Sequence, residues 1–224
     1  MKNVLLTGGI YHPFDETSAA LVSLFAELGV ESVVTENVAE AVAELEHADL
    51  FTINALRWRM ENDDKYAPHR ARWAFELPEA SASRIESFVE SGGGLLAMHT
   101  ASICFDTWYD FGQLLGGRWR WGSSFHPELG PVEVQAVVEH PVTDGLSRFE
   151  LADEVYHNLE VAADSEVLLE ARVPGSDWQA IAWCREWGEG RVVYDALGHG
   201  PESLACTPHR RLLRQSMLWL MGEL

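Results

Sequence analysis

The first half of the chain alternates short apolar runs with amphipathic stretches, and no other feature of the sequence restricts the fold as strongly. The runs and the helical patterns between them fall at residues 4–7, 17–28, 30–35, 38–45 and 48–53. Short apolar runs are typical of buried strands, and a period near 3.6 is typical of a helix with one buried face. The strand–helix–strand order predicts a parallel sheet joined by right-handed crossovers, and therefore an α/β protein.

A glycine-rich segment from Ser91 to Ala101 follows a helix that is predicted to end near residue 89. The segment is predicted to contain a glycine turn, a buried strand at 95–98 and a sharp turn with His99 at its apex. In α/β enzymes this strand-to-helix turn usually carries a nucleophilic Ser or Cys, because the tight backbone lifts one side chain clear of the sheet. An imidazole there is a poor acyl nucleophile but a good metal ligand or general base.

The second half of the chain contains a series of strand candidates. A helix is predicted over 107–115, strands over 132–138, 154–157, 167–171, 180–184 and 192–196, and a last helix over 208–221. Residues 55–80 have no clear period and are predicted to be a loop or an insertion near the carboxyl edge of the sheet. Because the 224 residues contain no repeat and no linker, we expect one domain over 1–224.

Charge and motifs limit the partners and cofactors of the chain. With 35 acidic against 16 basic residues the net charge is −19, and a surface of this sign repels nucleic acid. No apolar segment approaches the roughly 18 residues of a membrane span, so no membrane partner is expected. No glycine-rich dinucleotide or phosphate loop follows the first strand, which argues against a nucleotide cofactor. The three widely spaced cysteines argue against disulfides and favour a cytoplasmic location.

Three of the nine histidines directly follow predicted parallel strands: His12, His99 and His199. Ligands of open α/β sheets gather at the carboxyl ends of the strands, so we expect these three imidazoles to converge there. His157 joins them if the strand before it runs in the same direction. For His12 or His126 taken alone, a surface or hydrogen-bonding role is the commoner explanation.

Aromatic side chains are dense around the His99 turn and the segment after it, namely Trp108, Tyr109, Trp119 and Trp121. Core packing and the stacking of carbohydrate rings explain such a cluster equally well. Cys104 is expected to be a buried, unreactive thiol. Cys206 and His209 are explained better by a helix that starts at Pro208 than by a metal site.

Several motifs, taken in order, resemble the ThuA-like, trehalose-utilisation family across nearly the whole chain. They lie at residues 92–99, 114–117, 125–127, 153–157 and 190–202. The resemblance implies a fold similar to class I glutamine amidotransferases, a flavodoxin-like three-layer sandwich with a mainly parallel sheet. His99 stands where those enzymes have a cysteine, so glutaminase activity is not expected. The resemblance also implies carbohydrate metabolism, with trehalose, related disaccharides and their keto derivatives as candidate substrates.

The leading hypothesis is an enzyme, whether hydrolase, isomerase or lyase, that acts on a disaccharide or keto-sugar in a pocket lined by histidines. His12, His99 and His199 would hold a divalent metal such as Zn²⁺ and leave one coordination position open. His99, His199 and Glu202 are the candidate catalytic residues, and Glu202 or Asp153 would orient a ligating ring or carry a proton. The candidate substrate contacts are His12, His157, Trp121 and Tyr156.

Three alternatives stay open at this point. Without a metal, His99 and His199 would act as an acid–base pair, provided that their pKa values differ. A non-catalytic sugar-binding or regulatory module on a disabled amidotransferase fold would show no turnover. A subunit that requires a partner enzyme is the third alternative. A small-molecule carbohydrate is the expected ligand, and the sequence leaves open whether the chain forms a homo-oligomer.

Overall fold

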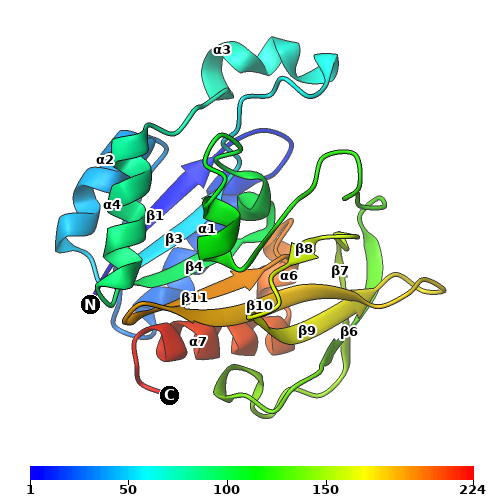
Figure 1. Cartoon of the computed structure of the whole chain (residues 1–224). Helices are drawn as coiled ribbons and strands as arrows, with labels where there is room; N and C mark the ends of the chain where they lie inside the picture. The colour runs from blue at the N-terminus through cyan, green and yellow to red at the C-terminus, as the bar shows by residue number, and fades with distance from the viewer.

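A nine-stranded sheet extends through the whole molecule (Figure 1). The computed structural model describes all residues from 1 to 224. In sheet order the strands are β2 (Glu31–Thr35), β1 (Lys2–Gly8), β3 (Leu50–Ala55), β4 (Gly94–Met98), β11 (Gly190–Asp195), β10 (Gln179–Trp187), β9 (Glu166–Arg172), β6 (Gly130–Ala136) and β7 (Phe149–Asp153). Neighbouring strands are parallel from β2 to β11 and antiparallel from β11 to β7. Two short strands, β5 (Gly117–Arg118) and β8 (Glu160–Val161), pair separately.

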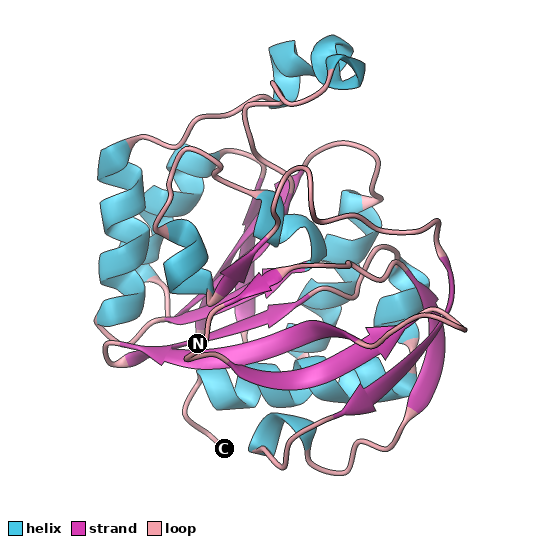
Figure 2. Ribbon diagram, turned by 45° about the vertical axis from the view of Figure 1, so that its right-hand side comes forward, coloured by secondary structure: helices cyan, strands magenta, loops and turns pink.

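Helices lie on both faces of the sheet and make three layers (Figure 2). One face carries α1 (Phe14–Ala26), α6 (Pro201–Ala205) and α7 (Thr207–Leu220), which contact one another. The other face carries α2 (Val38–Glu44) and α4 (Glu79–Glu90), and α5 (Phe111–Leu115) contacts β11. Short helical turns complete the chain: η1 (Leu45–His47), η2 (Asp64–His69), α3 (Arg70–Trp73), η3 (His99–Ile103) and η4 (Pro141–Thr143). This arrangement confirms the α/β class and the flavodoxin-like sandwich, with an antiparallel extension of the sheet.

Burial explains why these residues form these elements. β4 has the all-apolar sequence Gly-Leu-Leu-Ala-Met and is buried at every position, as expected for a strand that is covered on both faces. α7 begins with Pro208 in its first turn, where the missing N–H costs nothing, and buries apolar residues at helical spacing. The main core is one cluster of 52 buried residues drawn from both halves of the chain.

A second, smaller cluster lies apart from the main core. It consists of six buried residues, namely Ile10, Phe14, Leu56, Trp58, Met60 and Tyr66. These residues come from the loop after β1, the start of α1 and the segment that follows β3. The cluster supports η2 and α3, which project from the body of the molecule at the top of Figure 1.

Most predicted elements are confirmed, but two predictions about the second half of the chain are wrong. Residues 154–157 are no strand, because β7 ends at Asp153 and only His157 pairs further, in an isolated bridge with Phe125. The helix predicted over 107–115 begins only at Phe111. Residues 55–80, predicted as a loop or an insertion, contain the short helical turns η2 and α3. No helix is long and apolar enough to span a membrane.

The last strand in the sheet order, β7, ends beside the residues that follow the central strand β11. β7 is the last strand in the sheet, yet Asp153 at its end accepts hydrogen bonds from the backbone N–H groups of Gly198 and His199, just after β11. Adjacent strands of a sheet are rotated by roughly 20–25°, and this twist accumulates over many strands. The twisted edge of the sheet therefore returns to the carboxyl ends of the parallel strands.

Candidate functional site

Four side chains meet at the carboxyl ends of the parallel strands. His12 lies in the loop after β1, His99 follows β4 and His199 follows β11, while Glu154 comes from the end of β7. One ligand atom of each lies within 4.8 Å of the others. The structure thus brings together the three histidines that were expected to converge. We call these four residues the histidine–glutamate centre.

The rings of His12 and His99 are held so that their Nε2 atoms face each other. The Nδ1 of His99 lies 2.5 Å from the carbonyl oxygen of Ala196, and the Nδ1 of His12 lies 3.0 Å from that of Ile10. A carbonyl oxygen only accepts, so each Nδ1 donates its proton and each Nε2 carries a lone pair. The two Nε2 atoms are 3.1 Å apart. Two lone pairs at this distance repel each other unless a proton or a cation is shared between them.

The backbone at His99 is strained. Its φ angle is +44°, in the left-handed region that residues other than glycine rarely adopt. Strain of this kind costs of order 1–3 kcal/mol and persists where the surrounding structure fixes the residue, often at a functional site. At His99 this conformation directs the imidazole into the histidine–glutamate centre.

Glu154 is 7% exposed and lacks hydrogen bonds for one carboxylate oxygen. Its Oε2 lies 3.5 Å from Nε2 of His99 and 3.4 Å from Nδ1 of His199, and neither contact has hydrogen-bond geometry. Its Oε1 lies 3.4 Å from Nδ1 of His126. Leaving a buried acceptor and a buried imidazole nitrogen without partners costs about 1–3 kcal/mol each. A cation among these atoms would remove that cost.

Charges within the centre suit a cation. Burial, together with the nearby His99 and His199 rings, lowers the pKa of His12 to about 3. Burial alone would raise the pKa of Glu154, but the contacts with His199 and His99 outweigh it and hold the pKa well below its usual range. At neutral pH the centre therefore presents a neutral imidazole and an ionised carboxylate. Neutral imidazole nitrogens and carboxylate oxygens are typical ligands of Zn²⁺.

Two further groups border the centre. The hydroxyl of Tyr156 lies 3.1 Å from Nε2 of His99, and burial raises the pKa of this phenol well above its usual value. Tyr156 therefore stays protonated and able to donate a hydrogen bond. His126, whose side chain is 41% exposed, lies on the open side of Glu154. Sequence reasoning treated His126 as a surface residue and did not single out Glu154.

A buried network fixes the loop that carries His199. The Asp153 carboxylate accepts hydrogen bonds from Gly198 N at 2.8 Å, His199 N at 3.2 Å and the Ser203 hydroxyl at 2.5 Å. Behind it, His209 lies 2.9 Å from Asp195 through Nε2 and 3.0 Å from the Ser203 hydroxyl oxygen through Nδ1. The Asp195–His209–Ser203 array has the composition of a hydrolase triad. Ser203 is 1% exposed and donates to Asp153, so the array is structural and holds no nucleophile.

The other predicted site residues lie outside the centre. Glu202 is exposed in the first turn of α6 and approaches Gly200. The ring of His157 stacks on Phe125 at 4.7 Å, because residues 154–157 leave the strand and turn this side chain away from the histidines. Trp121 is 41% exposed and contacts Trp119, which in turn contacts Tyr156.

The cysteine nearest to the His99 turn, Cys104, has a buried thiol. Cys104 is buried, its thiol lies 3.2 Å from the carbonyl oxygen of Ala55, and burial raises its pKa to about 12. A thiol with such a pKa is no nucleophile at neutral pH. Arg118 and Arg120, further along the chain, both pair with Glu160, at 3.2 and 3.3 Å.

A second cluster that could bind a metal, formed by His140, Glu166 and Cys184, is less suitable. The Nδ1 of His140 accepts a hydrogen bond from Val142 N at 3.1 Å, so the ring proton sits on Nε2, the atom that faces Cys184. Burial also raises the pKa of Cys184 to about 12. The imidazole thus lacks a free lone pair, and the thiol resists ionisation.

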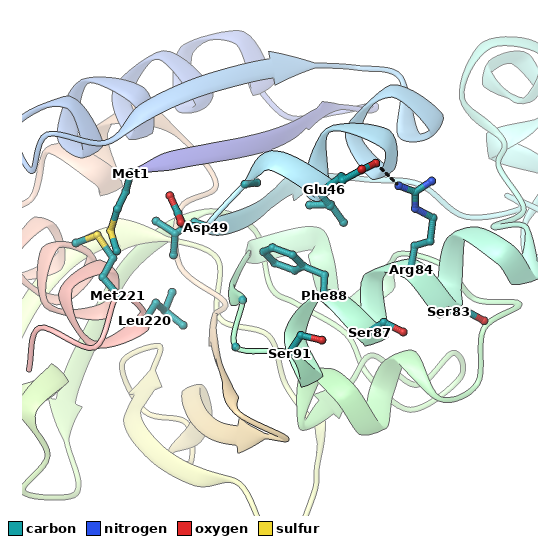
Figure 3. Close-up of a pocket in the computed structure, with 15 residues that line it drawn as sticks. Met1, Glu46, Asp49, Ser83, Arg84, Ser87, Phe88, Ser91, Leu220 and Met221 are labelled. Atoms are coloured by element: carbon teal, nitrogen blue, oxygen red, sulfur yellow. Dashed lines mark ion pairs between the residues drawn. The ribbon is translucent and has the colours of Figure 1, made fainter.

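A hollow of about 660 Å³ lies at the opposite edge of the sheet, where β3 and β4 begin (Figure 3). Met1, Phe88, Leu220 and Met221 give it an apolar side, and Arg84 pairs with Glu46 at 3.7 Å across its rim. No histidine or cysteine lines it. The chemistry-bearing side chains are therefore at the other edge of the sheet.

Comparisons with solved structures show the same fold. A ThuA-like protein from Parabacteroides merdae superposes with a TM-score of 0.78 at 18% identity, covering 99% of this chain and 90% of that one. A ThuA-like protein from Bacteroides uniformis gives 0.73 at 19%, covering 98% and 91%. A β-galactosidase from Rahnella sp. R3 gives 0.60 at 14%, and the chain covers 31% of that larger enzyme. At these identities the likeness concerns the fold alone.

Sequence comparison identifies the family. No curated protein matches the chain. The family model ThuA, described as trehalose utilisation, matches residues 4–220 and so includes all four members of the histidine–glutamate centre. The chain therefore belongs to the ThuA family.

Proposed function

We propose that this protein is an enzyme of carbohydrate metabolism whose active site is a divalent metal bound by His12, His99, His199 and Glu154. The observation that carries the proposal is the pair of Nε2 lone pairs 3.1 Å apart, beside a buried carboxylate oxygen without a hydrogen-bond partner. The trehalose-utilisation description of the family supports a disaccharide or a keto-disaccharide as the substrate.

The backbone supports metal binding by fixing the ring tautomers. Metal-ligating histidines almost always donate their second ring N–H to a carbonyl or carboxylate, which orients the ring and raises its basicity. His12 and His99 do so to Ile10 and Ala196. The Nδ1 of His199 faces the centre, and the backbone N–H of His199 donates a hydrogen bond to the Asp153 carboxylate.

The surrounding residues would handle protons and orient the sugar. A bound divalent metal would polarise a sugar carbonyl or hydroxyl oxygen. His126 donates Nδ1–H to the carbonyl oxygen of Pro127 at 2.9 Å, which leaves its Nε2 free to accept a proton on the exposed side. Tyr156 would donate a hydrogen bond from its hydroxyl. Hydrolysis, isomerisation or elimination next to a keto group would all use these groups.

A metal-free acid–base pair is the second candidate. The sequence suggested His99 with His199 for this pair, whereas the two pKa values that diverge belong to His12 and His199. The adjacent Glu154 carboxylate raises the pKa of His199, whereas burial lowers that of His12. Titratable groups whose environments separate their pKa values are suited to acid and base roles.

The three free cysteines, two of them buried, support the cytoplasmic location that we propose.

The deciding experiment is metal analysis of purified protein and of chelator-treated protein reloaded with Zn²⁺ or Mn²⁺. We expect about one equivalent per chain in wild type, and a loss of at least 10-fold in affinity in His12→Ala and Glu154→Gln. His157→Ala is the matched control, since this buried ring lies outside the centre. Absence of metal uptake would leave the acid–base pair, and sugar binding without turnover would indicate a binding module.

A further inference from the structure

Six aromatic rings form a continuous arc, and its Tyr156 end lies at the histidine–glutamate centre. In order they are Tyr11, Tyr66, Trp58, Trp121, Trp119 and Tyr156, with neighbouring ring centroids 6.3, 5.0, 6.2, 5.9 and 5.1 Å apart. Tyr11 immediately precedes His12, and the ring of Tyr156 lies 4.6 Å from that of His99. We call this set the aromatic arc.

The middle rings of the arc are held by packing and by one hydrogen bond. Trp58 and Tyr66 belong to the six-residue second cluster, and Nε1 of Trp58 donates to the side-chain oxygen of Asn62 at 2.9 Å. Trp121 is stacked on Trp58 with 25° between the planes, and Tyr66 and Trp119 meet it edge-on. Three rings therefore fix the orientation of Trp121, although 41% of this residue is exposed.

Tyr11 is exposed and strained. Its surface is 59% exposed, and its φ angle is +66°, a value that is a genuine outlier for a bulky residue. Tyr11 belongs to neither hydrophobic cluster, and its aromatic neighbours are Tyr66 and the edge-on ring of His69. Exposed aromatic rings held in place beside a reactive centre are typical of ligand-binding surfaces.

We infer that the aromatic arc is a second sugar subsite, which binds the ring of a disaccharide that does not react. This inference rests on the proposed function, in which the reacting ring lies at the metal. The apolar C–H face of a pyranose packs against an aromatic face, and its hydroxyls need polar partners at the rim. Glu61, Asn62 and Asp63 provide exposed acceptors on the same segment as Trp58.

A protein partner fits the arc less well. The two rings with substantial exposure would bury at most about 500 Å² if fully covered. Stable protein complexes bury about 800 Å² on each partner. The net charge of −19 also disfavours nucleotides and other phosphorylated ligands with flat rings. A sugar ring is small enough for the exposed area of the two rings, and it carries no charge that the protein would repel.

The test is calorimetric titration of the metal-loaded protein with trehalose and, separately, with methyl α-glucoside. We expect Trp121→Ala to weaken trehalose binding by about tenfold, corresponding to about 1.4 kcal/mol, and to change glucoside binding by less than about twofold. Trp178→Ala is the matched control, because the ring of Trp178 packs against Arg148 and Arg172 and lies outside the arc. Metal content of the Trp121→Ala protein should equal that of wild type.

Each result has a distinct meaning. Unchanged trehalose affinity in Trp121→Ala, or an equal loss in Trp178→Ala, refutes the subsite and leaves the metal centre intact. Equal weakening of both sugars also refutes it, since the arc would then contact the reacting ring. A wild-type protein that binds metal but neither sugar refutes the subsite together with the carbohydrate part of the proposed function. A protein without metal that still shows the tenfold effect supports the subsite alone.

Discussion

Removing His209 should destabilise the protein strongly, because it would leave Asp195 as an unpaired charge in the interior. Both residues are fully buried, and His209 Nε2 lies 2.9 Å from the Asp195 carboxylate. Breaking a buried pair by removing one partner costs about 3–5 kcal/mol. For a chain of this size each kcal/mol lowers Tm by about 2–4 °C, so His209→Leu should lower Tm by roughly 6–20 °C.

Replacing both partners should cost less than replacing one. The double variant Asp195→Leu/His209→Leu has no charge at this pair, but it leaves Leu197 N, which donates to Asp195 at 2.9 Å, without an acceptor. An unsatisfied buried donor costs about 1–3 kcal/mol. Urea unfolding followed by tryptophan fluorescence measures all four corners of the cycle. The reasoning is refuted if the double variant is as unstable as His209→Leu, or if His209→Leu loses less than about 1 kcal/mol.

The pair also makes stability depend on pH with a defined sign. Burial alone would lower the pKa of His209, but the Asp195 carboxylate outweighs it and the pKa is raised. A raised histidine pKa contributes stability that is fully present below the unfolded value of about 6.5 and is lost as pH rises through the folded value. The advantage of wild type over the double variant should therefore be largest near pH 6 and shrink above it.

Three further predictions concern single residues. Tyr11→Asn should keep or raise Tm, because Asn tolerates the left-handed backbone and relieves about 1 kcal/mol of strain, while trehalose affinity falls; a lower Tm would contradict this. The pKa of His12 is lowered to about 3, so protonation of this ring at acid pH favours unfolding. In chelator-treated protein, the stability of His12→Gln relative to wild type should therefore rise as pH falls below about 6.5. A stability difference without pH dependence would be evidence against this. Iodoacetamide at pH 8 should label Cys206 but neither Cys104 nor Cys184, whose pKa values burial raises to about 12, and peptide mass spectrometry would detect any exception.

The parallel half of the fold and three members of its site could be predicted because both depend on local patterns. Apolar runs alternating with helical periods specify β1 to β4, and a residue that follows a parallel strand must lie at the carboxyl edge of the sheet. His12, His99 and His199 satisfy this rule. Their positions required no knowledge of long-range contacts.

Glu154 was missed because its position depends on the antiparallel half of the chain. Val155 and Tyr156 look like the inside of a strand, but both are buried under loops after β7 has ended. Residues 154–157 were predicted as a strand, but they form a turn that places Glu154 in the histidine–glutamate centre and His157 against Phe125. The same turn explains why His126 lies beside Glu154, since Phe125 pairs with His157.

Because the end of β7 lies at the middle of the sheet, the histidine–glutamate centre joins the parallel strands to the edge strand β7. Its histidines follow strands from the parallel half, whereas Glu154 follows the edge strand at the other end of the sheet. The four ligands can meet only after the whole sheet has formed, so a metal bound there would report on completed folding. By holding the edge strand closed, it would also slow local opening and amide exchange in β7 more than in β2, the edge that carries no ligand.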